Sequence, residues 1–241
     1  MAEFAWHPED TPRIVKGPGS VLEPLARFAL IGDVHAEDER LEAAIEIAEK
    51  EGVERVLCVG DVCDGHGDLA RTVTLLESKK VIVVRGNHDR WFLRDEMRHL
   101  ELVHHRADFP AVARIVGLWP PLVEFWTLWG WMLLCHGVGD EDMASIDPAM
   151  PESQVMRLPA WQRILSAQKY AIVALGHTHK AMVRSIASIA VINPGTLKRD
   201  DDPCFGIVDL RRGSMQLYDL SVPKPSFLPP PINIPIPSPC A

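Results

Sequence analysis

The chain has 241 residues, of which 47% are hydrophobic and 24% charged, and this length is enough to bury a large core within one domain. Its formal net charge of −8 does not favour a nucleic-acid-binding protein, because affinity for phosphate depends mainly on Lys and Arg. The most apolar region, residues 118–135, contains two prolines and a Glu, which excludes an uninterrupted membrane span.

The cysteines indicate a reducing environment. There are 5 of them, with no CxxC pair, and an odd number favours reduced thiols over a disulfide framework. The first residues show no basic region followed by an apolar core, so no secretory signal is recognised. We therefore expect a cytoplasmic protein, and the sequence leaves its oligomeric state open.

In chain order, residues 1–24 have no clear period and predict a loose arm with room for one short edge strand. Three apolar runs then alternate with two stretches of helical spacing. The runs are residues 28–31, 55–59 and 81–84, and the helical stretches are residues 38–52 and 69–79. This alternation predicts an α/β fold with parallel strands. Ligands of such sheets bind beyond the carboxyl ends of the strands.

The second half of the chain predicts further strands and a tail. We expect a helix near residues 91–102, strands over residues 171–175 and 189–192, and hairpins over residues 124–135 and 205–220. After Val222 the chain becomes rich in proline, which favours extended polyproline conformations outside the core. The sequence thus predicts an arm (1–24), a domain (25–222) and a Pro-rich tail (223–241).

Polar clusters follow five of the apolar runs: "GDVH", "GDVCD", "RGNHD", "CHG" and "GHTH". They supply seven side chains that can bind a metal: Asp33, His35, Asp61, Asn87, His136, His177 and His179. A single His at a strand end is more often an ordinary hydrogen-bonded residue than a ligand, but five such clusters are improbable by chance. Imidazole with carboxylate suits first-row transition metals, and the lack of thiolates excludes a closed finger-type zinc site.

Seven ligands are too many for one ion that keeps an open coordination position. Two ions that share Asp61 would use all seven. Two-metal sites of this kind clamp the attacking and leaving oxygens of a phosphoryl transfer. The spacing fits, since Asp33 and His35, like His177 and His179, are two residues apart and can point the same way in extended backbone.

These motifs, in this order and spacing, resemble the calcineurin-like metallophosphoesterases over residues 28–220. The similarity is greatest to the small bacterial and archaeal phosphodiesterases of that family, in which the "NPG" of residues 193–195 is familiar. The resemblance implies a four-layer αββα sandwich, in which two mixed β-sheets are flanked by helices. It also implies a phosphate-ester substrate and two divalent transition-metal ions, with Mn favoured and Fe, Zn, Co or Ni as alternatives.

The resemblance further assigns roles to the residues. One ion would be held by Asp33, His35, Asp61 and His179, and the other by Asp61, Asn87, His136 and His177. A hydroxide bridging the ions would attack the phosphoryl group. His88 would protonate the leaving oxygen or stabilise charge on the phosphoryl group, and Asp64 or Asp89 would orient it and raise its pKa.

One departure from the pattern bears on the substrate. Protein phosphatases of this superfamily carry an Arg directly after the position of Asp64, and this chain has Gly65 there. The missing guanidinium removes a bidentate phosphate clamp and favours a phosphodiester or a small phosphomonoester. Arg85 and Arg90 could replace that clamp, or be ordinary surface charges.

Three alternative functions follow from the same resemblance. A Ser/Thr protein phosphatase is disfavoured by Gly65 and by the compact size of the chain. A non-catalytic scaffold with this fold, like the retromer subunit that has lost the catalytic His, is disfavoured by His88 and the full ligand set. A break-repair nuclease usually has more chain after the core.

Overall fold

The computed structural model describes residues 13–14, 23–222 and 232–237. Its helices and strands, in chain order, are β1 (Arg13–Ile14), β2 (Arg27–Ile31), α1 (Asp38–Lys50), β3 (Arg55–Cys58), α2 (Leu69–Ser78), β4 (Ile82–Val83), α3 (Asn87–Arg94), η2 (Arg106–Asp108), α4 (Pro110–Val116), β5 (Leu122–Thr127), β6 (Gly130–Cys135), α5 (Glu152–Val155), α6 (Pro159–Ser166), β7 (Tyr170–Ala174), β8 (Met182–Ile186), β9 (Ile189–Asn193), β10 (Cys204–Asp209), β11 (Ser214–Asp219) and β12 (Ile232–Pro235).

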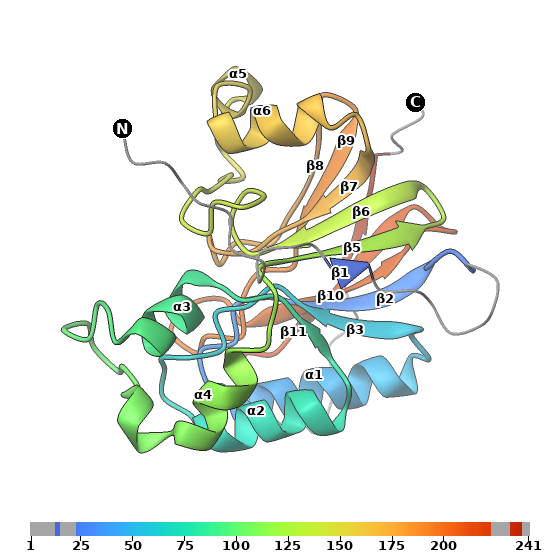
Figure 1. Cartoon of the computed structure of the whole chain (residues 1–241). Helices are drawn as coiled ribbons and strands as arrows, with labels where there is room; N and C mark the ends of the chain where they lie inside the picture. The colour runs from blue at the N-terminus through green and yellow to red at the C-terminus, as the bar shows by residue number, and fades with distance from the viewer. Residues whose placement is uncertain (1–12, 15–22, 223–231, 238–241) are drawn as a thin grey trace, which may run out of the picture.

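The strands form two six-stranded sheets that pack face to face. Sheet A has the order β1-β5-β6-β7-β9-β8, and sheet B has the order β12-β11-β10-β2-β3-β4. Figure 1 shows α5 and α6 outside sheet A, and α1, α2 and α4 outside sheet B. This is the four-layer αββα arrangement that the family resemblance implied, and both sheets are mixed, as expected.

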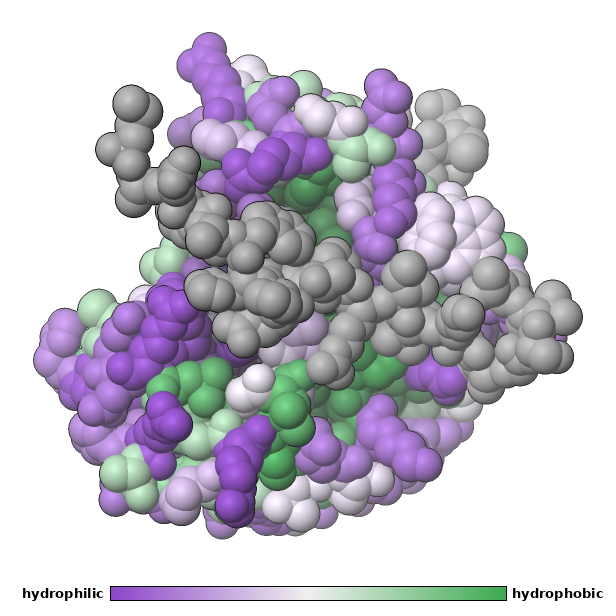
Figure 2. All heavy atoms as spheres, in the orientation of Figure 1, coloured by the Kyte–Doolittle hydropathy of each residue, from purple (hydrophilic) through white to green (hydrophobic). Residues whose placement is uncertain are grey.

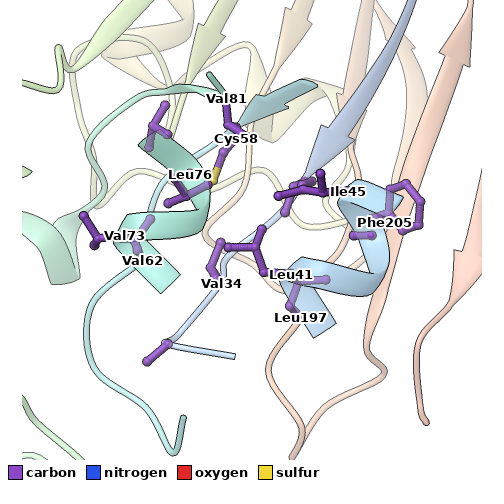
Figure 3. Close-up of a cluster of buried hydrophobic side chains, with 14 of the residues drawn as sticks. Val34, Leu41, Ile45, Cys58, Val62, Val73, Leu76, Val81, Leu197 and Phe205 are labelled. Carbon is purple, nitrogen blue, oxygen red and sulfur yellow. The ribbon is translucent and has the colours of Figure 1, made fainter. Parts of the chain in front are cut away.

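Alternation along the strands builds the layers. In β2, Phe28 and Leu30 point between the two sheets, while Ala29 and Ile31 point toward the helices. Figure 3 shows the helical side, where Leu41 and Ile45 of α1 lie among buried residues of sheet B and α2. On the other side of the molecule, Trp161 of α6 is completely buried against the outer face of sheet A. Each sheet is therefore covered on both faces, which explains its nearly continuous apolar strands.

The predicted strands and helices are largely confirmed. β2, β3 and β4 are parallel, as the alternation of apolar runs and helices predicted. Antiparallel β10 and β11 extend this sheet, so the interpretation from the runs alone, a purely parallel sheet, was incomplete. The helix expected near residues 91–102 instead begins at Asn87 and ends at Arg94. β8 and α4 were not predicted.

The C-terminal segment corrects one prediction. Ile232–Pro235 forms β12, which pairs with β11 at the edge of sheet B, and Ile236 is buried in the core between the sheets. Part of the Pro-rich tail thus belongs to the domain. The short edge strand expected in the N-terminal arm is β1, which pairs with β5. The rest of both terminal predictions lies outside the described residues.

The surface agrees with this layering. On the face drawn in Figure 2, hydrophilic residues cover much of the outer surface, and apolar residues are visible between them. Among the described residues, no helix is both long and apolar enough to cross a bilayer.

Candidate metal centre

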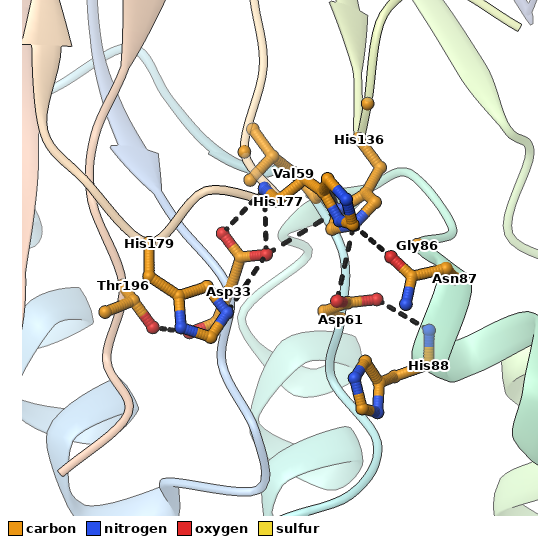
Figure 4. Close-up of polar contacts among 12 residues, drawn as sticks. Asp33, Val59, Asp61, Gly86, Asn87, His88, His136, His177, His179 and Thr196 are labelled. Carbon is orange, nitrogen blue, oxygen red and sulfur yellow. Dashed lines mark hydrogen bonds and ion pairs between the residues drawn. The ribbon is translucent and has the colours of Figure 1, made fainter. Parts of the chain in front are cut away.

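The seven predicted ligands meet at one edge of the sandwich. Each lies just beyond the carboxyl end of a strand: Asp33 after β2, His35 after β2, Asp61 after β3, Asn87 after β4, His136 after β6, and His177 and His179 after β7. Figure 4 shows side chains from both sheets pointing toward one another there. The two mixed sheets therefore bring residues up to about 150 positions apart in sequence into one cluster, as the strand-end rule predicts.

The potential ligand atoms fall into overlapping groups. Within each group the atoms lie within 4.8 Å of one another, and the groups are Asp33, His35 and His179; Asp61, His136 and His177; and His35, Asp61 and His88. The first two groups correspond to the two sets that the resemblance assigned. Asn87 joins the second, because its Oδ1 lies 2.9 Å from Nε2 of His136.

The outer nitrogens of three imidazoles are held by acceptors. Nδ1 of His35 lies 2.8 Å from the carbonyl oxygen of Asp64, and Nδ1 of His136 lies 2.9 Å from that of Val59. Nδ1 of His179 lies 2.7 Å from the Asp201 carboxylate. A proton on each Nδ1 satisfies these contacts and leaves Nε2 as the lone pair that faces the cluster, which is the arrangement typical of metal-bound His.

The inward-facing atoms fit a cation. Nε2 of His35 and Nε2 of His179 are 3.1 Å apart, and two lone pairs repel at this distance unless a proton or a metal ion lies between them. Nε2 of His136 is 3.3 Å from Oδ2 of Asp61, whose side chain is buried. The donors are imidazole, carboxylate and amide oxygen, a set that suits first-row transition metals.

Electrostatics in the cluster follow from burying two carboxylates among imidazoles. Burial lowers the pKa of His35 to about 4. Burial also opposes protonation of His136, but Asp61 and Asp33 outweigh it and raise the pKa of His136 to about 10. Burial raises the pKa of Asp33, whereas the pKa of Asp61 is lowered because His136 outweighs burial. The carboxylates of Asp61 and Asp33 therefore stabilise positive charge beside His136, whereas at His35 burial dominates.

His88, the predicted acid, is oriented by Asp64. Its Nδ1 lies 2.9 Å from Oδ2 of Asp64, and its ring lies edge-on to the rings of His35 and Trp91. Burial lowers the pKa of His88, but the hydrogen bond to Asp64 and the charge of Asp61 outweigh burial, so this pKa is raised. The structure thus brings Asp64, one of the two residues expected to orient His88, into contact with its ring.

Asp89 contributes to the raised pKa of His88 through its charge, but its hydrogen bonds go to the backbone. Its carboxylate accepts the backbone N–H groups of Val62, Cys63 and Gly86, each at 2.9 Å. None of these hydrogen bonds involves the His88 ring. Asp89 therefore ties the loop after β3 to the start of α3, and of the two residues expected to orient His88 only Asp64 bonds to it.

The two arginines proposed as phosphate clamps differ. Arg90 forms two hydrogen bonds to Asp142, at 2.6 and 3.1 Å, and a third to Glu96. These carboxylates engage its guanidinium, which favours the interpretation of Arg90 as a structural charge. Arg85 is half-buried, and its side chain has no hydrogen bond or ion pair with the part of the chain that the structure describes.

Gly65 is required by the packing of the loop. A Cβ atom at this position would lie 1.9 Å from the carbonyl oxygen of His35, which is far closer than any side chain can approach. Gly65 therefore permits a close backbone approach beside a predicted ligand. An Arg could not be introduced at this position without displacing the chain around His35.

Three residues at the site were not predicted. Asp201 accepts the hydrogen bond from His179, Arg98 binds Asp64, and the backbone N–H of His104 donates to Asp64 at 2.9 Å. The side chain of His104 also contacts Asp64, because its Nδ1 accepts the N–H of Asp64. The sequence motifs mark strand ends only, and nothing in the local pattern distinguishes these three residues from ordinary loop residues.

Comparisons with known proteins agree with this fold. Among solved structures, hypothetical protein PH1004 from Pyrococcus horikoshii OT3 is 16% identical, with a TM-score of 0.63 and coverage of 80% of this chain and 87% of that one. A novel archaeal phosphodiesterase is 17% identical, with a TM-score of 0.52 and coverage of 80% and 99%. Vacuolar Protein Sorting 29 from Cryptosporidium parvum is 20% identical, with a TM-score of 0.51 and coverage of 87% and 98%.

These identities are low, so the likenesses show a shared fold. A search of curated proteins found no match. The sequence model of the calcineurin-like phosphoesterase superfamily domain matches residues 27–213, which include all seven predicted ligands and the strands from β2 to β10. The chain therefore belongs to the calcineurin-like phosphoesterase superfamily.

Proposed function

We propose that this protein hydrolyses phosphate esters at a centre of two divalent transition-metal ions, with phosphodiesters as its preferred substrates. One ion would be held by Asp33, His35, Asp61 and His179, and the other by Asp61, Asn87, His136 and His177. Mn²⁺ is the favoured metal, because the donors are nitrogen and oxygen and include no thiolate.

The observation that carries this proposal is the convergence of the inward-facing donor atoms. Two groups of three side chains each bring ligand atoms within 4.8 Å of one another, and they come from different strand ends of both sheets. Nε2 of His35 and Nε2 of His179 face each other at 3.1 Å, where a shared cation would satisfy both. This convergence of ligand atoms favours a catalytic metal centre over a scaffold without catalytic function.

Bound metal ions would supply positive charge to the phosphoryl oxygens and lower the pKa of a water molecule. The protein's own residues supply the rest. His88 would donate a proton to the leaving oxygen as the phosphorus–oxygen bond breaks, and solvent water would afterwards return that proton. Its hydrogen bond to Asp64 fixes the orientation of the ring. Asp61 accepts the backbone N–H of His88 at 2.8 Å and so links the acid to the ligand cluster.

The preference for diesters rests on the cations around the site. Arg90, Arg98 and Arg199 are each paired with a carboxylate, that of Asp142, Asp64 and Glu37 respectively. A monoester dianion carries one more negative charge than a diester, and it gains more from a free guanidinium clamp. Gly65 offers no such clamp. These three pairs support a diester substrate, and Arg85, whose side chain has no partner among the described residues, is the one expected clamp that they leave available to a monoester.

Hydrolysis by the metal-loaded protein tests the proposal. Protein stripped of metal and reloaded with Mn²⁺ should hydrolyse bis(p-nitrophenyl) phosphate with a higher kcat/KM than p-nitrophenyl phosphate. The variant His136→Ala should lose this activity, and His105→Ala, a change at an exposed His of the same chain, should keep it. Protein that holds two equivalents of Mn²⁺ and hydrolyses neither ester would refute the proposed function, and a preference for the monoester would refute the substrate class.

A further inference from the structure

Arg98 connects an exposed segment to the candidate acid. It lies beyond the end of α3, where Asp95, Glu96 and Met97 are all exposed, yet its own side chain is only 8% exposed. Its guanidinium donates from NH1 to Oδ1 of Asp64 and from NH2 to Oδ2 of Asp64, both at 2.9 Å. Two parallel bonds to one carboxylate fix the plane of that carboxylate as well as its position.

Two of the three remaining N–H donors of Arg98 are also engaged. Nε donates to the carbonyl oxygen of Glu96 at 2.7 Å, and NH1 donates to that of His104 at 2.7 Å. The guanidinium is therefore held by the protein and is not free to bind a phosphate. Its position follows from the fold of the segment between α3 and η2, which turns back so that the backbone N–H of His104 also donates to Asp64, at 2.9 Å.

Asp64 lies at the centre of this network. Its carboxylate is 3% exposed and receives Arg98, the His104 backbone and Nδ1 of His88. Asp64 also has a left-handed backbone, with φ of 66°. Without Arg98, a buried carboxylate would lose its only Arg or Lys partner among the described residues, and nothing would fix which oxygen faces His88.

We propose that Arg98 is a positioning residue for His88, acting through Asp64, an inference that rests on the proposed phosphoesterase function. Arg98 fixes Asp64, and Asp64 holds the Nδ1 side of His88 and leaves Nε2 available to the leaving oxygen. Position 65, directly after Asp64, holds a Gly and supplies no guanidinium. Arg98, 34 residues after Asp64, brings a guanidinium to Asp64, and it binds the Asp64 carboxylate and not the substrate.

The test compares Arg98→Met with Arg184→Met. Arg184 is a matched control, because it also holds a loop through backbone carbonyls, those of Asp147, Pro148 and Met150, away from the cluster. Both variants should retain the metal content of the wild type. Arg98→Met should lower kcat for an aryl phosphodiester with a poor leaving group by about 10- to 100-fold, since a positioned acid contributes ~10²–10⁴-fold in total. It should change KM, and the rate with p-nitrophenolate as leaving group, by less than about threefold.

A double-mutant cycle separates positioning from general damage. In a His88→Ala background, Arg98→Met should cause no further loss, because the group through which Arg98 acts is gone. Additive losses, or equal losses with good and poor leaving groups, would overturn the proposal. If Arg98→Met fails to fold, Arg98→Lys serves instead, since Lys keeps the charge but cannot form two parallel bonds. Wild-type activity in Arg98→Lys would also overturn it.

A spectroscopic arm distinguishes this inference from the proposed function. In the full-length protein, the Nδ1–H proton of His88 should give a downfield NMR signal protected by Asp64, and that signal should disappear in Arg98→Met but persist in Arg184→Met. A signal unchanged in Arg98→Met would overturn the positioning role. Failure of the metal-loaded wild type to hydrolyse any ester would overturn the proposed function, and the NMR result would still decide the role of Arg98.

Discussion

Replacing Asp61 with Asn should abolish binding of both metal ions, whereas Asp33→Asn should remove only one. Both side chains are buried, with Asp33 0% and Asp61 2% exposed. Asn has the same shape as Asp, and its Oδ1 can still accept the His88 N–H that Asp61 accepts at 2.8 Å. The substitution therefore removes a charge with little change in packing. Asp61 belongs to both assigned ligand sets, and Asp33 belongs to one.

The size of the effect follows from the loss of charge. At an effective dielectric constant of about 20, two unit charges about 4 Å apart interact by about 4 kcal/mol. Distances of this order occur in the cluster, where Oδ2 of Asp61 lies 3.3 Å from Nε2 of His136. A loss of about 4 kcal/mol corresponds to about 10³-fold in affinity. In Asp61→Asn this weakening would apply to each of two ions.

The assay is metal content. Wild type, Asp33→Asn and Asp61→Asn are stripped with chelator, loaded with Mn²⁺, dialysed, and measured by inductively coupled plasma mass spectrometry. We expect two equivalents of Mn²⁺ in the wild type, one in Asp33→Asn and none in Asp61→Asn. Circular dichroism of the metal-free proteins controls for folding. Two equivalents in Asp61→Asn would refute the bridging role, and loss of both ions in Asp33→Asn would show that the ligand sets are wrongly divided.

Three further predictions concern the same site. Chelation should abolish hydrolysis of a phosphodiester and Mn²⁺ should restore it; full activity in metal-free protein would contradict the two-ion site. His88→Ala should keep both ions but lose ~10²–10⁴-fold in kcat with poor leaving groups and much less with p-nitrophenolate, as a leaving-group series would show. Gly65→Ala should lower the free energy of unfolding by more than Gly52→Ala, because a Cβ at Gly65 would lie 1.9 Å from the His35 carbonyl and one at Gly52 meets nothing within 4 Å. Equal losses in denaturant titrations would show that the loop at Gly65 can move.

The fold could be predicted from the sequence wherever strands are buried on both faces. Runs such as residues 28–31 and 171–175 are continuously apolar, and such runs predict strands without any periodicity. β8 is different, because it is an edge strand in which Val183, Arg184 and Ser185 are not buried, so it lacks this signal. β12 contains a proline, which a strand at a sheet edge tolerates because its N–H need not pair.

The start of α3 could not be predicted from the "RGNHD" motif that contains it. Asn87, His88 and Asp89 were interpreted as the polar end of a strand, but they form the first turn of this helix. Asp89 at the third position accepts the N–H of Gly86, as an acidic side chain often does at a helix start. The motif therefore predicted that these residues lie near the cluster. It did not predict the helical turn, which places Asn87 and His88 on neighbouring positions of a helix.

The strand-end positions of the expected ligands could be predicted, and the contacts that support them could not. Asp33 and His136 follow strands directly, so their position is fixed by the sheet. Arg98 reaches Asp64 across 34 residues, and Asp201 reaches His179 across 22 residues. Both come from loops whose path depends on tertiary packing. Single-sequence patterns carry local information, and contacts of this kind are set by the three-dimensional path of the chain.

Backbone strain gives an argument for function that does not depend on side-chain chemistry. Four of the predicted ligands, His35, Asp61, His177 and His179, have left-handed backbones, with φ between 46° and 67°. The extended backbone expected for the pairs Asp33/His35 and His177/His179 is therefore wrong, although both pairs reach the same cluster. For residues with a Cβ this conformation costs on the order of 1–3 kcal/mol each, and it persists only where surrounding structure enforces it. A cluster of ordinary surface histidines would relax to remove this cost. Here the strained residues are those whose donor atoms converge on one centre. The strain therefore lowers the stability of the fold at the positions that direct these side chains toward the proposed metal site.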